Sequence, residues 1–155
     1  MTAAATPEFF AAPVPPGHLT SLPEPICDFQ VGLTSDRYVV NPSVVPDESE
    51  RWITVMGNFR DCGIADFEAG NPVFGEQGRL RAWVQGRANM GARARVYCDR
   101  SNVPLVQQEL AGLSWLWWIA TLDGNKLSPS YLPGMWGVQY TGNNRYDTSV
   151  LYGEW

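Results

Sequence analysis

Glycine and proline interrupt this 155-residue chain so often that little room is left for long helices. It contains 15 glycines and 12 prolines, and the segments between them are short and rich in β-branched and aromatic residues. Closely spaced glycines and prolines favour short strands joined by turns, because proline lacks a backbone donor and both residues weaken element interiors. The spacing predicts a mainly β fold, an antiparallel sandwich or partly closed barrel of about seven to nine short strands with one short helix.

The first 25 residues differ from the rest of the chain. They hold six of the twelve prolines together with Phe9 and Phe10. Such a segment is not expected in a helix or a central strand, and a purely disordered tail would be poor in large apolar groups. We therefore expect residues 1–25 to form an extended arm that docks on its own domain or on a neighbour, and residues 26–155 to form a single β-rich domain.

Runs of β-branched and aromatic residues bounded by turn residues predict the individual strands. These runs are residues 26–33, 38–45, 51–56, 135–140 and 145–152, the last two forming a hairpin. Residues 58–78 contain four glycines and are expected to be irregular, with a short strand near Val73 and Phe74.

One helix is predicted, at residues 101–112. It begins with a capping Ser or Asn, has a proline in its first turn and ends at a glycine. The apolar run 113–122 that follows fits either a buried central strand or a continuation of this helix, and the Asp123-Gly124 turn after it favours a strand.

Positive charge is concentrated between Arg79 and Arg100. These 22 residues hold six of the ten arginines and one acid, Asp99, for a formal +5 in a chain of net charge -5. At a period of two, residues 79–85 and 92–99 alternate between apolar and polar, which predicts the two half-buried strands of a hairpin. The arginines, with two aromatic rings, would then lie on its outward face.

This outward face has two interpretations. Across the predicted hairpin each arginine meets a polar, aromatic or acidic group, which fits an ordinary solvated sheet surface. Arg, Trp and Tyr are also the residues that dominate binding energy in interfaces, which fits a contact surface. With the arm, the predicted partner-binding residues are Phe9, Phe10, Arg79, Arg81, Trp83, Arg87, Arg93, Arg95 and Tyr97.

The predicted partner is a protein, either copies of this chain or the major protein of an assembly. The sequence pI of about 4.7 argues against nucleic acid, since nucleic-acid-binding domains are usually basic. Ten arginines against a single lysine, Lys126, also fit bidentate recognition of carboxylates better than a diffuse phosphate field. The +5 segment complements the -10 of the remaining residues, which favours contacts between copies.

No catalytic or metal-binding motif stands out. The one histidine, His18, lies in the proline-rich arm, and Cys27, Cys62 and Cys98 lack the spacing of a zinc site or a disulfide framework. Asp61 and Asp66 form the most suggestive acid pair, although carboxylates in loops are usually solvated. We therefore expect no enzyme, no catalytic residue, no cofactor and no metal.

The C-terminal third offers a possible ligand site. Aromatic and amide side chains together suit sugar binding, because the rings stack and the amides give directed hydrogen bonds. The same aromatic residues would also fit simple pairing across the final hairpin. The candidates are Trp136, Tyr140, Asn143, Asn144 and Tyr146.

These features predict a non-enzymatic structural subunit that docks through its N-terminal arm and its Arg-rich hairpin. By analogy, the concrete hypothesis is a virion component, such as a capsid decoration or minor capsid protein or a tail or neck protein. The alternative is a β-sandwich module that binds carbohydrate or another small ligand, and a third hypothesis is a small β-barrel enzyme using Asp61 and Asp66. We expect synthesis in the cytoplasm without a signal peptide, location in a virion, and no membrane span.

Overall fold

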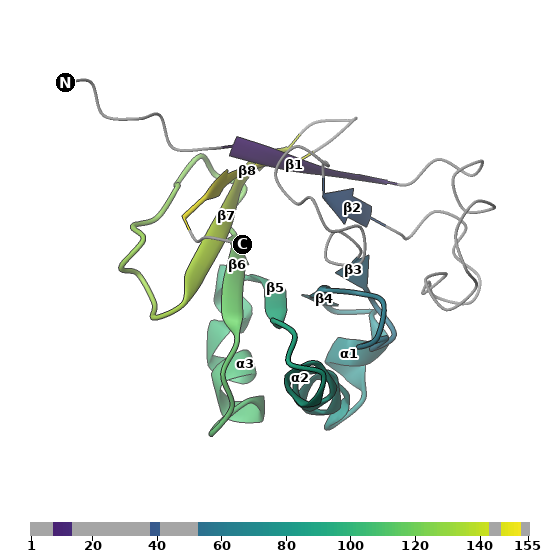
Figure 1. Cartoon of the computed structure of the whole chain (residues 1–155). Helices are drawn as coiled ribbons and strands as arrows, with labels where there is room; N and C mark the ends of the chain where they lie inside the picture. The colour runs from purple at the N-terminus through teal and green to yellow at the C-terminus, as the bar shows by residue number, and fades with distance from the viewer. Residues whose placement is uncertain (1–7, 14–37, 41–52, 143–146, 153–155) are drawn as a thin grey trace.

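The computed structural model describes residues 8–13, 38–40, 53–142 and 147–152 (Figure 1). Within these residues the chain forms one eight-stranded sheet in the order β2-β1-β8-β7-β6-β5-β4-β3. The strands are β1 (Glu8–Pro13), β2 (Tyr38–Val40), β3 (Ile53–Thr54), β4 (Ile64–Phe67), β5 (Arg95–Asp99), β6 (Leu116–Ala120), β7 (Met135–Gly142) and β8 (Asp147–Leu151). The helices are α1 (Pro72–Gly75), α2 (Arg79–Asn89) and α3 (Val103–Glu109), with a 3₁₀ turn (Arg100–Asn102) before α3. The fold is sheet-rich, as predicted.

The prediction that neighbouring strands are antiparallel is wrong for half of the sheet. Each neighbouring pair from β3 to β7 is parallel, whereas β7, β8, β1 and β2 pair antiparallel. The connections explain the difference. α1 and α2 link β4 to β5, and α3 links β5 to β6, so in these two connections the chain returns along the sheet and the next strand runs in the same direction; loops make the connections from β3 to β4 and from β6 to β7.

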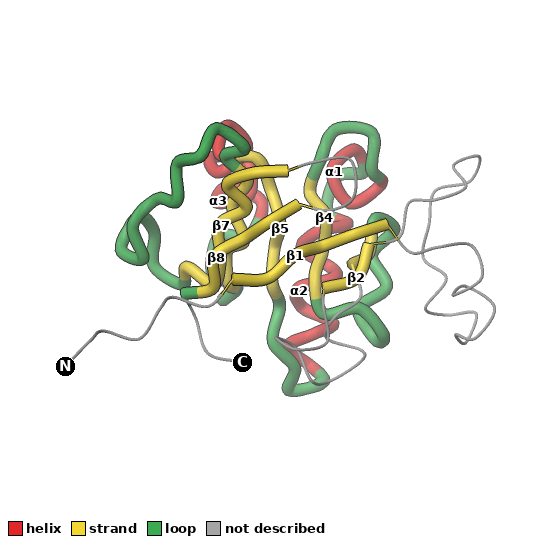
Figure 2. Tube along the Cα trace, turned by 90° about the horizontal axis from the view of Figure 1, so that it is seen from above, coloured by secondary structure: helices red, strands yellow, loops and turns green. Residues whose placement is uncertain are grey.

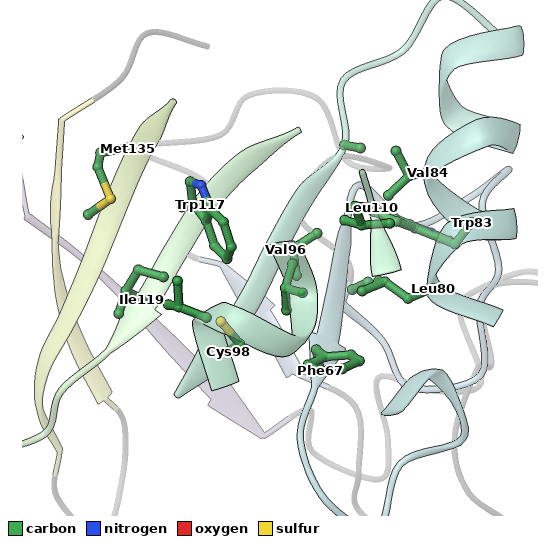
Figure 3. Close-up of a cluster of buried hydrophobic side chains, with 14 of the residues drawn as sticks. Phe67, Leu80, Trp83, Val84, Val96, Cys98, Leu110, Trp117, Ile119 and Met135 are labelled. Atoms are coloured by element: carbon green, nitrogen blue, oxygen red, sulfur yellow. The ribbon is translucent and has the colours of Figure 1, made fainter. Parts of the chain in front are cut away.

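The two faces of the sheet are covered differently. In Figure 1 the three helices lie below the central strands, and β1 with β2, at one end of the same sheet, lies above them; Figure 2 shows β1 crossing over the central strands towards β2. The helix face packs a large core against α2 and α3 (Figure 3). Its labelled members are Phe67, Leu80, Trp83, Val84, Val96, Cys98, Leu110, Trp117, Ile119 and Met135. We call the face opposite the helices the inner face. It holds a second cluster, formed by Ile53, Ile64, Trp118, Trp136 and Leu151.

The predicted Arg-rich hairpin is wrong in its first half. Residues 79–89 form helix α2, which buries Leu80, Trp83 and Val84 in the core. These three residues have the i, i+3, i+4 spacing of one helix face. Gly86, taken as part of a loop, lies inside the helix, where a Cβ would come within 2.4 Å of the Phe59 ring.

The second half of that hairpin is a strand, β5, and the predicted alternation holds for part of it. Val96 and Cys98 belong to the helix-face core, and Tyr97 lies against the inner-face cluster. Arg95, predicted in solvent, is only 1% exposed because the inner face is also covered.

Several other predicted elements are confirmed. The predicted helix appears as the 3₁₀ turn and α3, the run 113–122 forms strand β6, and the final hairpin is β7 with β8. Residues 58–78 were predicted less well, because they contain the buried strand β4, and Val73 and Phe74 lie in α1.

The N-terminal segment is described only in part. Residues 8–13 of the predicted arm form the extended strand β1, which pairs with β8 and β2. The rest of residues 1–25, including His18, and the predicted strand 26–33 lie outside the described residues. In the part of the chain that the structure describes, no helix has the length and apolarity needed to cross a membrane.

Candidate functional site

At the carboxyl ends of several parallel strands, polar side chains accept backbone hydrogen bonds and stabilise the turn that follows. After β3, the Thr54 Oγ1 accepts hydrogen bonds from three successive backbone amides, at 3.2, 2.9 and 3.0 Å. After β5, the Asp99 Oδ1 accepts from the Ser101 amide at 2.9 Å, and after β6 the Asp123 Oδ1 accepts from the Asn125 amide at 2.9 Å. Ligand sites of α/β proteins lie at this carboxyl edge of parallel strands.

Asp66, near the end of β4, is the one buried acidic residue among those whose side chains the structure describes. It is 8% exposed, and its Oδ1 has no hydrogen-bond partner within the described part of the chain. Burial raises the pKa of this carboxyl well above 3.8, and a hydrogen bond with the Glu68 side chain and that group's charge raise it further. Asp66 is therefore a carboxyl group that favours its protonated form.

A tight turn brings Glu68 back beside Asp66. The Asn71 amide donates to the Glu68 carbonyl oxygen at 3.1 Å, and the Asn71 Nδ2 donates to the Asp66 carbonyl oxygen at 3.1 Å. Gly70 completes the turn with φ +97°, a conformation that glycine adopts without a Cβ clash. The turn holds an exposed carboxyl group, that of Glu68, next to a buried one.

Asp66 lies on the inner face, beside a network of polar and aromatic side chains. It is two residues beyond Ile64 on β4 and directly opposite Tyr97 on β5. The Tyr97 Oη donates to the Gln139 Oε1 at 2.5 Å, and the Tyr97 ring packs edge-on against Trp118 with centroids 4.7 Å apart. This network fixes the residues that surround the carboxyl group.

The inner-face network extends away from Asp66 to β8. The Trp118 Nε1 donates to the Ser149 Oγ at 3.0 Å, and Trp118 packs edge-on against Trp136 at 5.7 Å. The Arg95 guanidinium lies over the Trp136 ring, 5.3 Å from its centroid. A buried network of this kind makes the inner face rigid.

Cys98 lies on the other side of the sheet and offers no nucleophile. Burial raises the pKa of its thiol to about 12, with further contributions from the charges of Asp99, Asp66 and Glu68. The thiolate is the reactive form of cysteine, so this thiol is inert near neutral pH. Cys62 is likewise buried with a free thiol, and Cys27 lies outside the described residues.

The residues predicted to bind a partner do not form one surface. Trp83, Arg87 and Arg95 are each at most 2% exposed, so a partner cannot reach them in the folded chain. The Trp83 Nε1 donates to the Asn58 carbonyl oxygen at 3.2 Å. The Arg87 guanidinium donates to the carbonyl oxygens of Arg93 and Phe59, at 2.8 and 3.2 Å.

Two further arginines of that set stabilise neighbouring segments. Arg79 pairs with Glu76 and donates to the Met56 carbonyl oxygen at 2.6 Å. Arg81 donates to the carbonyl oxygens of Glu109 and Ala111, at 3.0 and 2.9 Å, and so caps the end of α3. Arg93 is exposed, Tyr97 belongs to the inner-face network, and the side chains of Phe9 and Phe10 lie outside the described set.

Of the predicted sugar-binding residues, the structure describes Trp136 and Tyr140, both on β7. Trp136 is fully buried, and Tyr140 is half-buried with the Lys126 Nζ 4.7 Å from its ring centroid. Asn143, Asn144 and Tyr146 lie outside the described residues.

Asp61 and Asp66 lie at opposite ends of β4. Asp61 precedes the strand, and its Oδ2 accepts from the Asn58 Nδ2 at 3.3 Å. The acidic neighbour of Asp66 is instead Glu68, whereas the sequence suggested a pair with Asp61. The sequence signal for this pair was an acid, Asp66, inside the apolar run Ile64–Phe67, with a second acid two positions later.

The described residues contain no group of three or more His, Cys, Asp or Glu side chains suited to hold a metal ion. The candidate site is therefore a pair of carboxyl groups. Asp66 is buried and has a raised pKa, and Glu68 is exposed to water. A scan against protein families finds no matching model, and no curated protein or solved structure matches this chain.

Proposed function

We propose that this chain is a hydrolytic domain in which Asp66 and Glu68 act as an acid–base pair at the carboxyl edge of the sheet. The observation that carries the proposal is the buried Asp66 carboxyl, whose pKa is raised by burial and by Glu68. A general acid must hold a proton near its working pH, and burial beside a second carboxyl is how proteins achieve this. This proposal replaces the expectation of no enzyme with a specific chemical role.

The two carboxyl groups have different surroundings and therefore different proposed roles. Asp66 is buried, so it donates its proton to the oxygen of the leaving group. Glu68 is exposed, so it accepts a proton from the attacking water. The bond between substrate carbon and leaving oxygen breaks as the bond from water to that carbon forms. Asp66 gives up one proton and Glu68 takes up one, and return of a proton from Glu68 to Asp66 along their hydrogen bond restores the pair.

The proposed substrate class is carbohydrate. Cleavage of a glycosidic bond is the reaction for which proteins commonly use a pair of carboxyl groups, one of them kept protonated. The half-buried hydroxyl group of Tyr97 lies in the same network and suits a substrate rich in hydroxyl groups.

The experiment measures reducing ends released from a panel of soluble polysaccharides, for the wild type, Asp66→Asn and Glu68→Gln. We expect the wild type to cleave at least one polysaccharide and each variant to lose about a hundredfold or more in rate. Asp61→Asn is the matched control, since it removes a nearby carboxylate that is not in the pair. The proposal fails if the wild type cleaves no polysaccharide faster than Asp66→Asn does.

A second candidate is the assembly subunit that the sequence favoured, with a virion component as its concrete form. The observation that favours it is β1, because a segment of the proposed extended arm, residues 8–13, joins the sheet through backbone pairing with β8 and β2. A strand added in this way is also how a chain docks on a neighbour. On this proposal the sheet curls into a partly closed barrel, and strand β1 of the arm forms part of its wall.

The native mass, measured by light scattering at low and high salt, tests this second candidate. A defined oligomer that dissociates as salt rises would support a subunit held by complementary charge. A monomer at every salt concentration, combined with carbohydrate cleavage, would leave the hydrolytic domain as the function.

A further inference from the structure

Leu122, the second residue after β6, adopts a backbone conformation that leucine normally avoids. Its φ is +56°, in the left-handed region, where the Cβ of a bulky residue approaches the following carbonyl oxygen. Its side chain is 54% exposed. A bulky apolar side chain is thus held in an unfavourable conformation and left in water.

Leu127, in the same loop, has a similar backbone conformation that packing of its side chain explains. It also has a positive φ, +50°, but its side chain is half-buried and packs against the helix-face core. Burial of the side chain offsets the backbone strain at Leu127. Within the described part of the chain, Leu122 belongs to neither hydrophobic cluster.

The backbone around Leu122 is fixed by hydrogen bonds to β7. The amides of Thr121 and Leu122 both donate to the Gln139 carbonyl oxygen, at 2.9 and 3.3 Å, and the Gly124 amide donates to the Tyr140 carbonyl oxygen at 2.8 Å. The Thr121 hydroxyl closes the turn by donating to the Asn125 carbonyl oxygen at 2.8 Å. The unfavourable conformation persists because its surroundings determine it, which is the pattern seen at functional sites.

Leu122 lies at the same edge of the sheet as the carboxyl pair. Gln139, whose carbonyl oxygen fixes Leu122, accepts the Tyr97 hydroxyl through its side chain, and Tyr97 stands opposite Asp66. The loop after β6 and the turn after β4 therefore follow the same ends of two parallel strands that are separated by β5 alone.

We infer that Leu122 contacts the substrate of the Asp66–Glu68 site and determines its specificity, by covering the apolar face of a sugar ring. This inference rests on the function proposed above. An exposed leucine with positive φ contributes little to folding, since glycine would fit the backbone better. Its apolar surface becomes useful when a substrate removes it from water.

Steady-state kinetics test the inference, using the polysaccharide of the panel that the wild type cleaves fastest. Leu122→Ala removes the side chain and keeps the backbone strain, whereas Leu122→Gly removes both. We expect each variant to raise KM about tenfold and to leave kcat within about twofold, the pattern of lost substrate binding. Leu105→Ala is the control, because Leu105 is a similarly exposed leucine, 47%, on helix α3.

The outcomes separate the two proposals. An active wild type whose KM is unchanged in both Leu122 variants overturns the specificity role and leaves the carboxyl pair in place. A wild type that cleaves no polysaccharide overturns both. Thermal unfolding of each variant verifies that it is folded at the assay temperature.

Discussion

Asp66 and Tyr97 stand directly opposite each other on the parallel strands β4 and β5, on the inner face of the sheet. The Tyr97 hydroxyl donates its proton to Gln139 rather than to its neighbour Asp66. The Asn71 side chain stabilises the charged form of the Asp66 carboxyl, but burial and the neighbouring Glu68 outweigh it, so the pKa of Asp66 stays well above its ordinary value.

Asp66 is expected to make the stability of the fold depend on pH. Its pKa is raised in the folded state, so its contribution to stability is fully present below the ordinary value of 3.8 and is lost as pH rises through the folded pKa. Asp66→Asn should therefore raise the free energy of unfolding at pH 7, because the neutral amide avoids the cost of burying a charge. The two proteins should converge near pH 3.

Thermal unfolding between pH 3 and pH 8 measures this effect. The expected loss of activity in Asp66→Asn would then accompany a gain in stability, which separates a chemical role from simple misfolding. An Asp66→Asn protein less stable than the wild type at pH 7 would contradict a neutral buried carboxyl.

Gly86→Ala should destabilise the protein. The added Cβ would lie 2.4 to 2.7 Å from three atoms of the Phe59 ring, so the loop after β3 or helix α2 has to move. Overpacking of this kind costs about 1–3 kcal/mol. Urea unfolding measures the loss, and Gly75→Ala, where a Cβ meets nothing within 4 Å, is the matched control.

Arg87→Ala and Arg93→Ala should differ strongly although both remove an arginine. The buried Arg87 guanidinium donates to two carbonyl oxygens, so its loss should cost about 2–3 kcal/mol. Arg93 is exposed, and its loss should cost about 0.5 kcal/mol. Equal, small effects in chemical denaturation would instead fit an exposed hairpin.

Leu122→Gly and Leu127→Gly should change stability in opposite directions. Glycine relieves the left-handed strain at both positions, which is worth about 1 kcal/mol. At Leu122 nothing offsets this gain, so the melting temperature should rise. At Leu127 the lost packing against the core should outweigh it, and differential scanning calorimetry would show a lower melting temperature.

The sequence predicted the strands whose two faces differ in polarity. Val96 and Cys98 face the core as the alternation required, because β5 places successive side chains on opposite faces. The alternation failed for α2, where Leu80, Ala82 and Val84 fit a strand over a window too short to exclude a helix. Trp83 packs in the core with Leu80 and Val84, and the i, i+3, i+4 spacing of these three residues is that of a helix face.

The candidate site was harder to predict than the fold because it depends on burial. Asp66 resembles a loop carboxylate in the sequence, since it lies between glycines and beside other acids. Its chemistry arises only when parallel pairing buries β4 on both faces, and the sequence predicted no strand there. The prediction that Arg95 is exposed was wrong for the same reason, since an arginine in an alternating strand is expected to face water.

The pairing of β1 with β8 joins Glu8 to Val150, residues from opposite ends of the described chain. During synthesis the ribosome releases β1 long before β8 exists, so the parallel strands β3 to β7 can form while the inner face is still uncovered. The polar network of the inner face, in which Ser149 on β8 accepts from Trp118, is therefore completed only after β8 has been synthesised.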